Sequence, residues 1–271
     1  LRVMIGKKHG TVISRTLLTE GRDSMPAVEN GSLILDDLNG AQRQAVQHGD
    51  GPLLIVAGAG TGKTKTLVHR VAQQIQQGIP PGRVLLLTFT RRAAAEMLRR
   101  VDGLLRQLHG SGCSQRGGSF VQAVWGGTFH AIAARLLRLY APAAGLEPAF
   151  TILDRSDSED LLDVVRTELG LSKTDQRFPR KGTCLAIYSH CVNAQQALEQ
   201  VLAAQFPWCR DGAADLKRLF AAYGERKEQG GILDYDDLLL FWRGLLADSQ
   251  VGQQIRSRFD CVLVDEYQDT N

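Results

Sequence analysis

Short apolar runs alternate with longer segments of helical periodicity along the first half of the chain. Residues 53–56 are all apolar, and residues 84–87 are apolar before Thr88. Such runs are typical of strands buried on both faces of a parallel sheet. Segments 63–77 and 91–108 follow them with helical spacing. This alternation predicts an α/β fold with a doubly wound parallel sheet.

The same pattern predicts further elements. Asn39 is placed to cap a helix that continues to residue 46. We expect an exposed loop over the Gly- and Ser-rich stretch 109–119. The remaining elements of this part are expected to be a strand over 121–125, a helix over 129–140, a helix over 234–246 and a buried strand over 261–264.

The pattern changes between residues 141 and 228, where strand-like runs are scarce. Helical spacing is expected over 156–168, 185–204 and 213–229, and Gly230-Gly231 marks the end of the region. We interpret it as a helical insertion between two parts of one α/β domain.

Composition narrows the class of protein only slightly. The 271 residues are 44% hydrophobic and 23% charged, with a net charge of +3, as in ordinary globular proteins. Lys and Arg are concentrated between residues 60 and 120, a stretch that could face a polyanion or form a solvated helix face. Five cysteines without a C-x-x-C pair favour reduced thiols in the cytoplasm. No apolar run approaches a membrane span.

A glycine-rich loop follows the first apolar run. Its turn needs Gly58, Gly60 and Gly62 so that backbone N–H groups can point at phosphates, and Lys63 can reach the β and γ phosphates. Thr64 supplies a hydroxyl for Mg²⁺, and the helix that starts there points its positive end at the nucleotide. The complete loop is Ala57, Gly58, Ala59, Gly60, Thr61, Gly62, Lys63 and Thr64.

Two adjacent carboxylates, Asp265 and Glu266, follow the last apolar run. At a strand end they project in different directions, so one can hold Mg²⁺ while the other accepts a proton from an attacking water. Such a pair alone is usually a solvated turn. Combined with the phosphate loop in one sheet, it predicts a site for ATP and Mg²⁺.

Several short motifs occur in the order found in superfamily 1 DNA helicases of the UvrD/Rep/PcrA type, and residues 33–271 resemble that family. The motifs are Leu38-Asn39 with Gln42, the loop 57–64, Thr88-Phe89-Thr90, Gly127-Thr128-Phe129-His130, Asp234-Tyr235-Asp236-Asp237-Leu238-Leu239 and residues 264–271. The resemblance implies a RecA-like first lobe over 33–129 and 229–271, with an inserted helical subdomain over 130–228.

The resemblance also implies roles for individual residues. Glu266 would be the catalytic base, Thr64 and Asp265 the Mg²⁺ ligands, and Gln268 the link between the γ-phosphate and movement. Gln42 would read the adenine edge, and Lys65 would extend the nucleotide site. The implied track for single-stranded DNA comprises Phe89, Thr90, Arg91, Thr128, Phe129 and His130, where Phe89 could stack a base.

Some positions depart from the family pattern. Ala57 stands where the general phosphate loop begins with Gly. Arg91-Arg92 replaces Asn-Lys after Thr90, which keeps or raises the positive charge. Lys65 replaces a common Arg, and Lys stacks on a base plane less well than Arg.

Both ends of the chain carry an expectation. Residues 1–32 are interpreted as a disordered extension, with 1–24 lying upstream of a natural start at Met25 and having no packed role. The resemblance places the second motor lobe, with its arginine fingers, after residue 271. We therefore expect weak binding of Mg·ATP, little hydrolysis, no unwinding, and an uncovered sheet edge that favours aggregation.

The sequence indicates the first part of an ATP-dependent DNA helicase or translocase, with 3′ to 5′ movement and a role in repair or replication restart implied by the resemblance. Two alternatives stay open: the motor part of a RecB/AddA-like helicase–nuclease, and a non-hydrolysing, ATP-gated module that binds single-stranded DNA. A small-molecule kinase fits less well, because it leaves the motifs at 127–130 and 265–271 unexplained.

Overall fold

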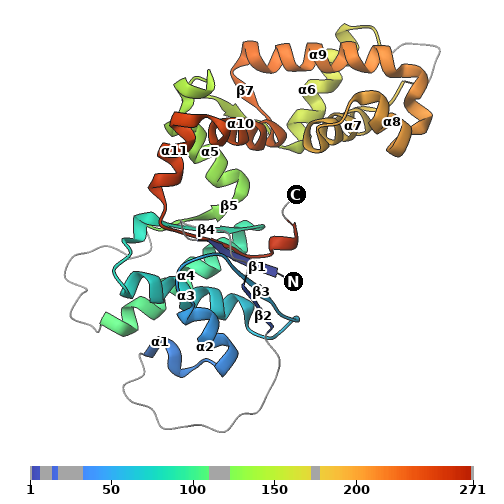
Figure 1. Cartoon of the computed structure of the whole chain (residues 1–271). Helices are drawn as coiled ribbons and strands as arrows, with labels where there is room; N and C mark the ends of the chain where they lie inside the picture. The colour runs from blue at the N-terminus through green and yellow to red at the C-terminus, as the bar shows by residue number, and fades with distance from the viewer. Residues whose placement is uncertain (1, 7–13, 18–32, 110–122, 172–177, 270–271) are drawn as a thin grey trace. The chain divides into compact units, whose positions relative to one another are not determined.

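The computed structural model of the chain describes residues 2–6, 14–17, 33–109, 123–171 and 178–269. These residues form two compact units, one of residues 1–132 with 254–271 and the other of residues 133–253. The first unit is built on a six-stranded sheet and the second is mainly helical (Figure 1).

The first unit combines strands from both ends of the chain. Its elements are β1 (Arg2–Gly6), β2 (Ser14–Leu17), α1 (Leu33–Asp36), α2 (Gly40–Gln47), β3 (Leu53–Val56), α3 (Lys63–Gln76), η1 (Pro81–Arg83), β4 (Val84–Thr88), α4 (Arg91–His109), β5 (Trp125–Thr128), β8 (Cys261–Val264) and η6 (Tyr267–Asp269). Helices α5 (Phe129–Leu139) and α11 (Ser249–Arg258) cross the division between the units.

The order of strands in the sheet is β2-β3-β1-β8-β4-β5. Strand β4 is parallel to β8 and to β5. Strand β1 is antiparallel to both β3 and β8, so β3 runs in the same direction as β8. The carboxyl ends of β3, β8, β4 and β5 therefore share one edge of the sheet. The predicted parallel α/β arrangement is confirmed for these strands, whereas β1 is antiparallel.

The N-terminal extension, which was expected to be disordered, contributes two short strands to the sheet. Strand β1 pairs along β3 from Arg2↔Val56 to Ile5↔Leu53 and also pairs with β8. Strand β2 pairs with β3 in parallel. Single strands of four or five residues carry too little periodicity to be read from sequence. Strand β1 lies between β3 and β8 and forms backbone hydrogen bonds with both.

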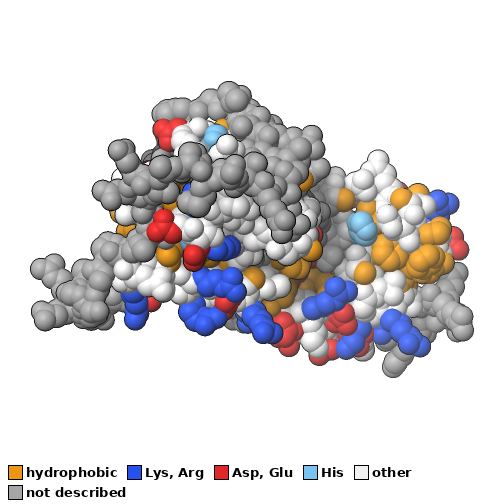
Figure 2. Space-filling model, turned by 90° about the horizontal axis from the view of Figure 1, so that it is seen from below, with side chains coloured by type: hydrophobic (Ala, Val, Ile, Leu, Met, Phe, Trp, Pro, Cys, Tyr) orange, Lys and Arg blue, Asp and Glu red, His pale blue; other side chains and the backbone are white. Residues whose placement is uncertain are grey.

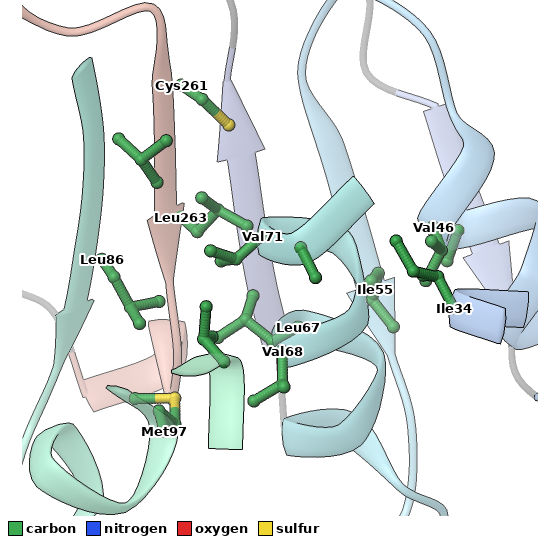
Figure 3. Packing of buried hydrophobic residues seen from close by; sticks show 14 of the residues in the cluster. Ile34, Val46, Ile55, Leu67, Val68, Val71, Leu86, Met97, Cys261 and Leu263 are labelled. Carbon is green, nitrogen blue, oxygen red and sulfur yellow. The ribbon is translucent and has the colours of Figure 1, made fainter. Parts of the chain in front are cut away.

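The core of the first unit lies between the sheet and helices α2, α3 and α4. Every residue of β4 is buried, whereas β3 and β8 alternate buried and half-buried positions. Figure 3 shows Leu67, Val68 and Val71 of α3 lying between Leu86 and Leu263 on one side and Ile55 on the other. This packing places the first turn of α3 at the carboxyl edge of the strands.

A buried arginine fixes the helix that precedes β3. Arg70 of α3 is 1% exposed, and its guanidinium donates to the carbonyl oxygens of Ala45, Val46 and His48 at 2.7–3.0 Å. These carbonyls belong to the C-terminal turn of α2, where intrahelical partners are missing. The N-terminus of α2 has the expected Asn39 cap, with a full capping box.

The third strand differs from its prediction. The expected strand was 121–125, and the structure has β5 over Trp125–Thr128, in parallel register with β4; residues 121 and 122 lie outside the described part. Glycines are unfavourable in strands, so Gly126-Gly127 did not indicate one. A Cβ at Gly126 would lie 2.6 Å from the Leu98 side chain, so glycine is required for α4 to approach β5.

The second unit is a helical assembly with a small two-stranded sheet. Its elements are η4 (Ala141–Ala144), β6 (Thr151–Ile152), α6 (Arg155–Glu168), α7 (Lys181–Ala194), α8 (Leu198–Gln205), η5 (Pro207–Gly212), α9 (Ala213–Gly230), β7 (Ile232–Leu233) and α10 (Tyr235–Ala247). The parallel β6–β7 pair was not predicted, because two-residue strands leave no pattern in the sequence.

One predicted helix of this unit is two helices. The helix expected over 185–204 is split between α7 and α8, because Gln195 adopts a left-handed φ of 52° that ends α7. Neither Gly nor Pro marks this break in the sequence. The predicted helices 156–168, 213–229 and 234–246 correspond to α6, α9 and α10 within a few residues.

The boundary at the end of the helical unit also differs from the sequence interpretation. The α/β lobe was expected to resume at residue 229, whereas the second unit extends to Gln253 and includes α10. Asp236 of α10 accepts hydrogen bonds from Ser189 and Asn193 of α7, which ties α10 to the helical unit. The exposed loop expected over 109–119 lies, apart from its first residue, outside the described residues.

Candidate functional site

The residues singled out from the sequence follow strand ends at one edge of the sheet. The phosphate loop follows β3, Asp265 and Glu266 follow β8, Phe89 follows β4, and Phe129 follows β5. Since these four strands are parallel, their carboxyl ends lie together. In open α/β sheets this edge is the usual position of a ligand site.

The phosphate loop has the backbone geometry that its glycines predict. Gly60 and Gly62 have φ values of 79° and 85°, a region that glycine enters without steric strain. The ammonium of Lys63 donates to the carbonyl oxygens of Ala57 and Gly58, at 3.3 and 2.6 Å. The loop thus encloses its own lysine, at the N-terminus of α3, where the helix dipole favours an anion.

Two side chains connect the loop and the start of α3 to the segment around α2. Gln42, which is 7% exposed, donates from Nε2 to the carbonyl oxygen of Thr61 at 2.9 Å. Lys65 donates to the carbonyl oxygen of Asp37 at 2.5 Å. Both residues were assigned to the nucleotide site from the resemblance. In the structure both side chains donate hydrogen bonds to backbone carbonyl oxygens.

The two carboxylates after β8 have different surroundings. Asp265 is 5% exposed, whereas Glu266 is half-buried. Burial raises the pKa of the Asp265 carboxyl, and the charge of Glu266 raises it further, while the Glu266 amide and Lys63 act in the opposite direction. The influence of Lys63 on Asp265 indicates that the phosphate loop and the acidic pair belong to one electrostatic site.

Glu266 has an unusual backbone conformation. Its φ is 53°, a left-handed value that costs a residue with a side chain about 1–2 kcal/mol. Its carboxylate accepts a 2.6 Å hydrogen bond from Nε2 of Gln268. Strained backbone of this kind is concentrated at functional sites.

A buried hydroxyl beside the acidic pair tests whether the site suits a divalent cation. Leu87 and Val264 are the last aligned residues of β4 and β8, so Thr88 and Asp265 are neighbours on the same face. The Thr88 hydroxyl is buried without a hydrogen-bond partner in the described part of the chain. An ionised Asp265 carboxylate and this hydroxyl are hard oxygen donors of the kind that Mg²⁺ prefers, as is the Thr64 hydroxyl of the loop.

The residues assigned to a DNA track lie at the β4 and β5 ends of the same edge. Thr88 and Thr128 are aligned in the β4–β5 pair, so Phe89, Thr90 and Arg91 lie near Phe129 and His130. The Phe89 side chain is 62% exposed, although an isolated phenylalanine is more often a core residue. The hydroxyls of Thr90 and Thr128 accept hydrogen bonds from the first turns of α4 and α5.

The basic stretch between residues 60 and 120 is partly neutralised. Arg99 and Arg100 pair with Glu96, and Arg106 pairs with Asp102. Figure 2 shows acidic side chains interspersed among Lys and Arg side chains on the visible face. The arginines at the start of α4, Arg91 and Arg92, are exposed and lie directly after Phe89.

Comparison with known proteins identifies the family of the chain. A family model described as the UvrD/REP helicase N-terminal domain matches residues 38–271. The chain belongs to this family. Its membership agrees with the order of motifs from Gln42 to Gln268 and with the α/β fold seen here.

Several curated relatives cover most of this chain. The ATP-dependent DNA helicase UvrD1 of Mycobacterium tuberculosis is 39% identical over 249 residues, 91% of this chain. DNA helicase II of Escherichia coli K12 is 35% identical over 89% of it, and the ATP-dependent DNA helicase PcrA of Leuconostoc citreum 34% over 88%. The matched region spans only 30–31% of each relative's length.

Thr88 is a candidate site residue for which the sequence alone indicated no role. The available signal was a threonine closing an otherwise apolar strand. The Asp234–Leu239 motif, by contrast, serves within the helical unit, where Asp234 and Asp237 accept hydrogen bonds from the buried Lys227.

No group of three or more His, Cys, Asp or Glu side chains suited to a metal occurs in the described residues. Within those residues, no helix has the length and apolar character of a membrane span.

Proposed function

We propose that this chain is the ATP-binding part of an ATP-dependent DNA helicase that moves on single-stranded DNA. One observation carries the proposal: a glycine-rich loop with an enclosed lysine and an Asp-Glu pair follow strands whose carboxyl ends share one edge of the sheet. The family membership gives this arrangement its reaction class. Movement from 3′ to 5′ and a role in repair or replication restart follow from the resemblance.

In this proposal the loop residues bind the triphosphate. Backbone N–H groups of the loop and the N-terminus of α3 surround the phosphates. The Lys63 ammonium exchanges its carbonyl partners for phosphate oxygens. Since it already lies within the loop, the exchange needs no large movement of the backbone.

Thr64 and Asp265 would hold Mg²⁺, with the Thr88 hydroxyl close to Asp265. The ion supplies charge neutralisation for the phosphates. Glu266 is the proposed general base, because its half-buried carboxylate lies beside Asp265 and accepts only a single described hydrogen bond, from Gln268. The hydrogen bond from Gln268 goes to Oε2 of this carboxylate, so Oε1 is the oxygen proposed to take the proton from a water.

Nucleotide binding is tested by calorimetry of the whole chain with Mg·ATP. We expect Lys63→Ala to weaken binding about 10- to 100-fold, since a hydrogen bond to a charged group contributes roughly 1.5–3 kcal/mol. The control Lys217→Ala removes an exposed lysine of the helical unit and should leave binding unchanged. Equal affinity of the Lys63 variant and the wild type would contradict the proposal.

Hydrolysis is tested separately, with and without oligo-dT. Glu266→Gln should bind Mg·ATP as the wild type does and remove any turnover. Turnover that persists in this variant would exclude Glu266 as the base.

The DNA part of the proposal rests on Phe89. Stacking of a base on an aromatic side chain contributes roughly 1–3 kcal/mol, so Phe89→Ala should weaken oligo-dT binding by about fivefold or more. Val164 is also an exposed apolar residue, and Val164→Ala in the helical unit is the matched control. A fluorescence titration that shows the same affinity for both variants would argue against a track at this edge.

A further inference from the structure

The carboxamide of Gln42 forms a bridge between two parts of the site. Its Oε1 accepts a hydrogen bond of 3.0 Å from the backbone N–H of Asn39. Its Nε2 donates to the Thr61 carbonyl at 2.9 Å. The backbone N–H of Gln42 is bound by the Asn39 side chain at 2.9 Å. Both ends of this buried amide are therefore fixed, one by the N-terminus of α2 and the other by the phosphate loop.

The same amide also packs against Gly62, the residue that precedes α3. A Cβ built on Gly62 would lie 2.7 Å from the Gln42 Nε2, closer than any unbonded contact allows. Gly62 has a φ of 85° and directly precedes Lys63. Gln42 therefore touches the loop on both sides of the Thr61–Gly62 peptide.

We propose that Gln42 is a positioning residue for the phosphate loop, acting on the triphosphate half of the nucleotide whatever base is attached. The inference rests on the proposed nucleotide-binding function and deepens it. It is compatible with adenine recognition, because an amide keeps a second N–H and a second lone pair after these two hydrogen bonds.

The loop has a physical need for such a support. Its glycines give it many accessible backbone conformations, and each must be restricted before the N–H groups can converge on phosphate. Ordering that is present before binding does not have to be supplied by the ligand. The Thr61 hydroxyl, which donates to the Gly58 carbonyl at 2.9 Å, restrains the loop from within, and Gln42 restrains it from α2.

Tripolyphosphate is the probe that separates the two roles, because it carries the phosphates without a base. Calorimetry should compare the affinities of the wild-type chain, Gln42→Ala and Gln44→Ala for Mg·tripolyphosphate. Gln44 is an exposed residue of the same helix. Gln42→Ala should weaken binding about two- to tenfold, the factor expected for one hydrogen bond, and Gln44→Ala should not. Unchanged tripolyphosphate affinity in Gln42→Ala, together with weaker ATP binding, would overturn the inference.

Hydrogen exchange of the nucleotide-free chain provides a test that needs no ligand. Gln42→Glu keeps the oxygen that accepts from Asn39 but loses the donor to Thr61. We expect faster exchange of loop amides 58–64 in Gln42→Glu and Gln42→Ala than in Gln44→Ala. The amides of α2 should be unchanged in Gln42→Glu. Unchanged exchange of the loop would overturn the inference. If the wild type binds neither ATP nor tripolyphosphate while the loop exchange responds as expected, the proposed function fails and the support by Gln42 stands.

Discussion

The side-chain amide of Gln268 donates a hydrogen bond of 2.6 Å to the carboxylate of Glu266, a residue with a left-handed backbone. The contact joins the proposed base to the residue assigned to coupling. It also shows that the strained turn after β8 is held by a side chain within the turn itself. A strained residue that is kept for chemistry should be replaceable by glycine with a gain in stability.

We therefore expect Glu266→Gly to be more stable than Glu266→Ala by about 1 kcal/mol, because glycine alone enters the left-handed region without cost. Urea denaturation measures the difference. Glu225 lies exposed within α9, where the order should reverse, with Ala more stable than Gly by roughly 1 kcal/mol. The same order at both positions would show that Glu266 is not strained.

A second prediction concerns the buried hydroxyl at the end of β4. Thr88 is 1% exposed and has no hydrogen-bond partner in the described structure. An unsatisfied buried polar group costs roughly 1–3 kcal/mol, so the isosteric Thr88→Val should stabilise the ligand-free chain by about that amount. If the hydroxyl serves the cation site, the same variant should bind Mg·ATP less tightly.

The matched control is Thr128, which is aligned with Thr88 in the β4–β5 pair. Its hydroxyl accepts a hydrogen bond from the Ala131 amide, so Thr128→Val should destabilise the chain by about 1 kcal/mol. Thermal denaturation compares the two variants. A loss of stability in Thr88→Val would mean that its hydroxyl has a partner in solution.

The sequence predicted those parts of the fold that depend on strong local signals. The buried run of β4, the capping residue Asn39 and the glycine loop each identified an element because local chemistry and tertiary structure agree there. The glycine strand β5 was misplaced, since Gly126 is required by the Leu98 side chain of another helix. The α7–α8 break at Gln195 likewise depends on packing rather than on a breaker residue.

The candidate site also divides into features that local motifs predicted and features that depend on packing. The motifs indicated which residues meet at the sheet edge, since parallel strands bring their carboxyl ends together. They did not indicate that Gln42 bonds the Thr61 carbonyl or that Thr88 is buried beside Asp265. Those contacts depend on which side chains of segments far apart in the sequence become neighbours in the fold. Local sequence patterns do not specify these neighbours.

A third prediction uses the raised pKa of Asp265. A carboxyl whose pKa is higher in the folded state stabilises the fold when protonated, below the ordinary value of 3.8, and this contribution is lost as pH rises through the folded-state pKa. At pH 7 the buried charge is therefore unfavourable. Asp265→Asn should be more stable than the wild type at pH 7, and the difference should disappear near pH 4.

Added Mg·ATP should reverse the order at pH 7, because only the wild type gains a cation ligand. Melting temperatures with and without the nucleotide measure both effects. Asp211→Asn, an exposed position of the helical unit, should change neither curve. A pH-independent gain in Asp265→Asn would mean that the folded state does not disfavour the Asp265 charge.

The last prediction concerns the buried ion cluster of the helical unit. The Lys227 ammonium lies 2.6 Å from carboxylate oxygens of both Asp234 and Asp237 and over the Tyr188 and Tyr223 rings. The side chains of the lysine and the two aspartates are at most 10% exposed. Asp234 and Asp237 also form the capping box of α10, so the cluster joins α9 to the start of α10.

Lys227→Met should destabilise the chain by about 3–5 kcal/mol at pH 7, because it leaves two carboxylates buried without their cation. The exposed pair Lys217–Glu199 offers the control, and Lys217→Met should cost less than about 1 kcal/mol. Burial already raises the pKa of Asp237, and Lys227 counteracts this rise. Without Lys227 the pKa of Asp237 rises further in the folded state, so the destabilisation should shrink as pH falls toward 4. Urea titrations at pH 7 and pH 4 measure this, and a loss that is equal at both pH values would show that packing of the lysine stem, rather than its charge, holds α9 and α10 together.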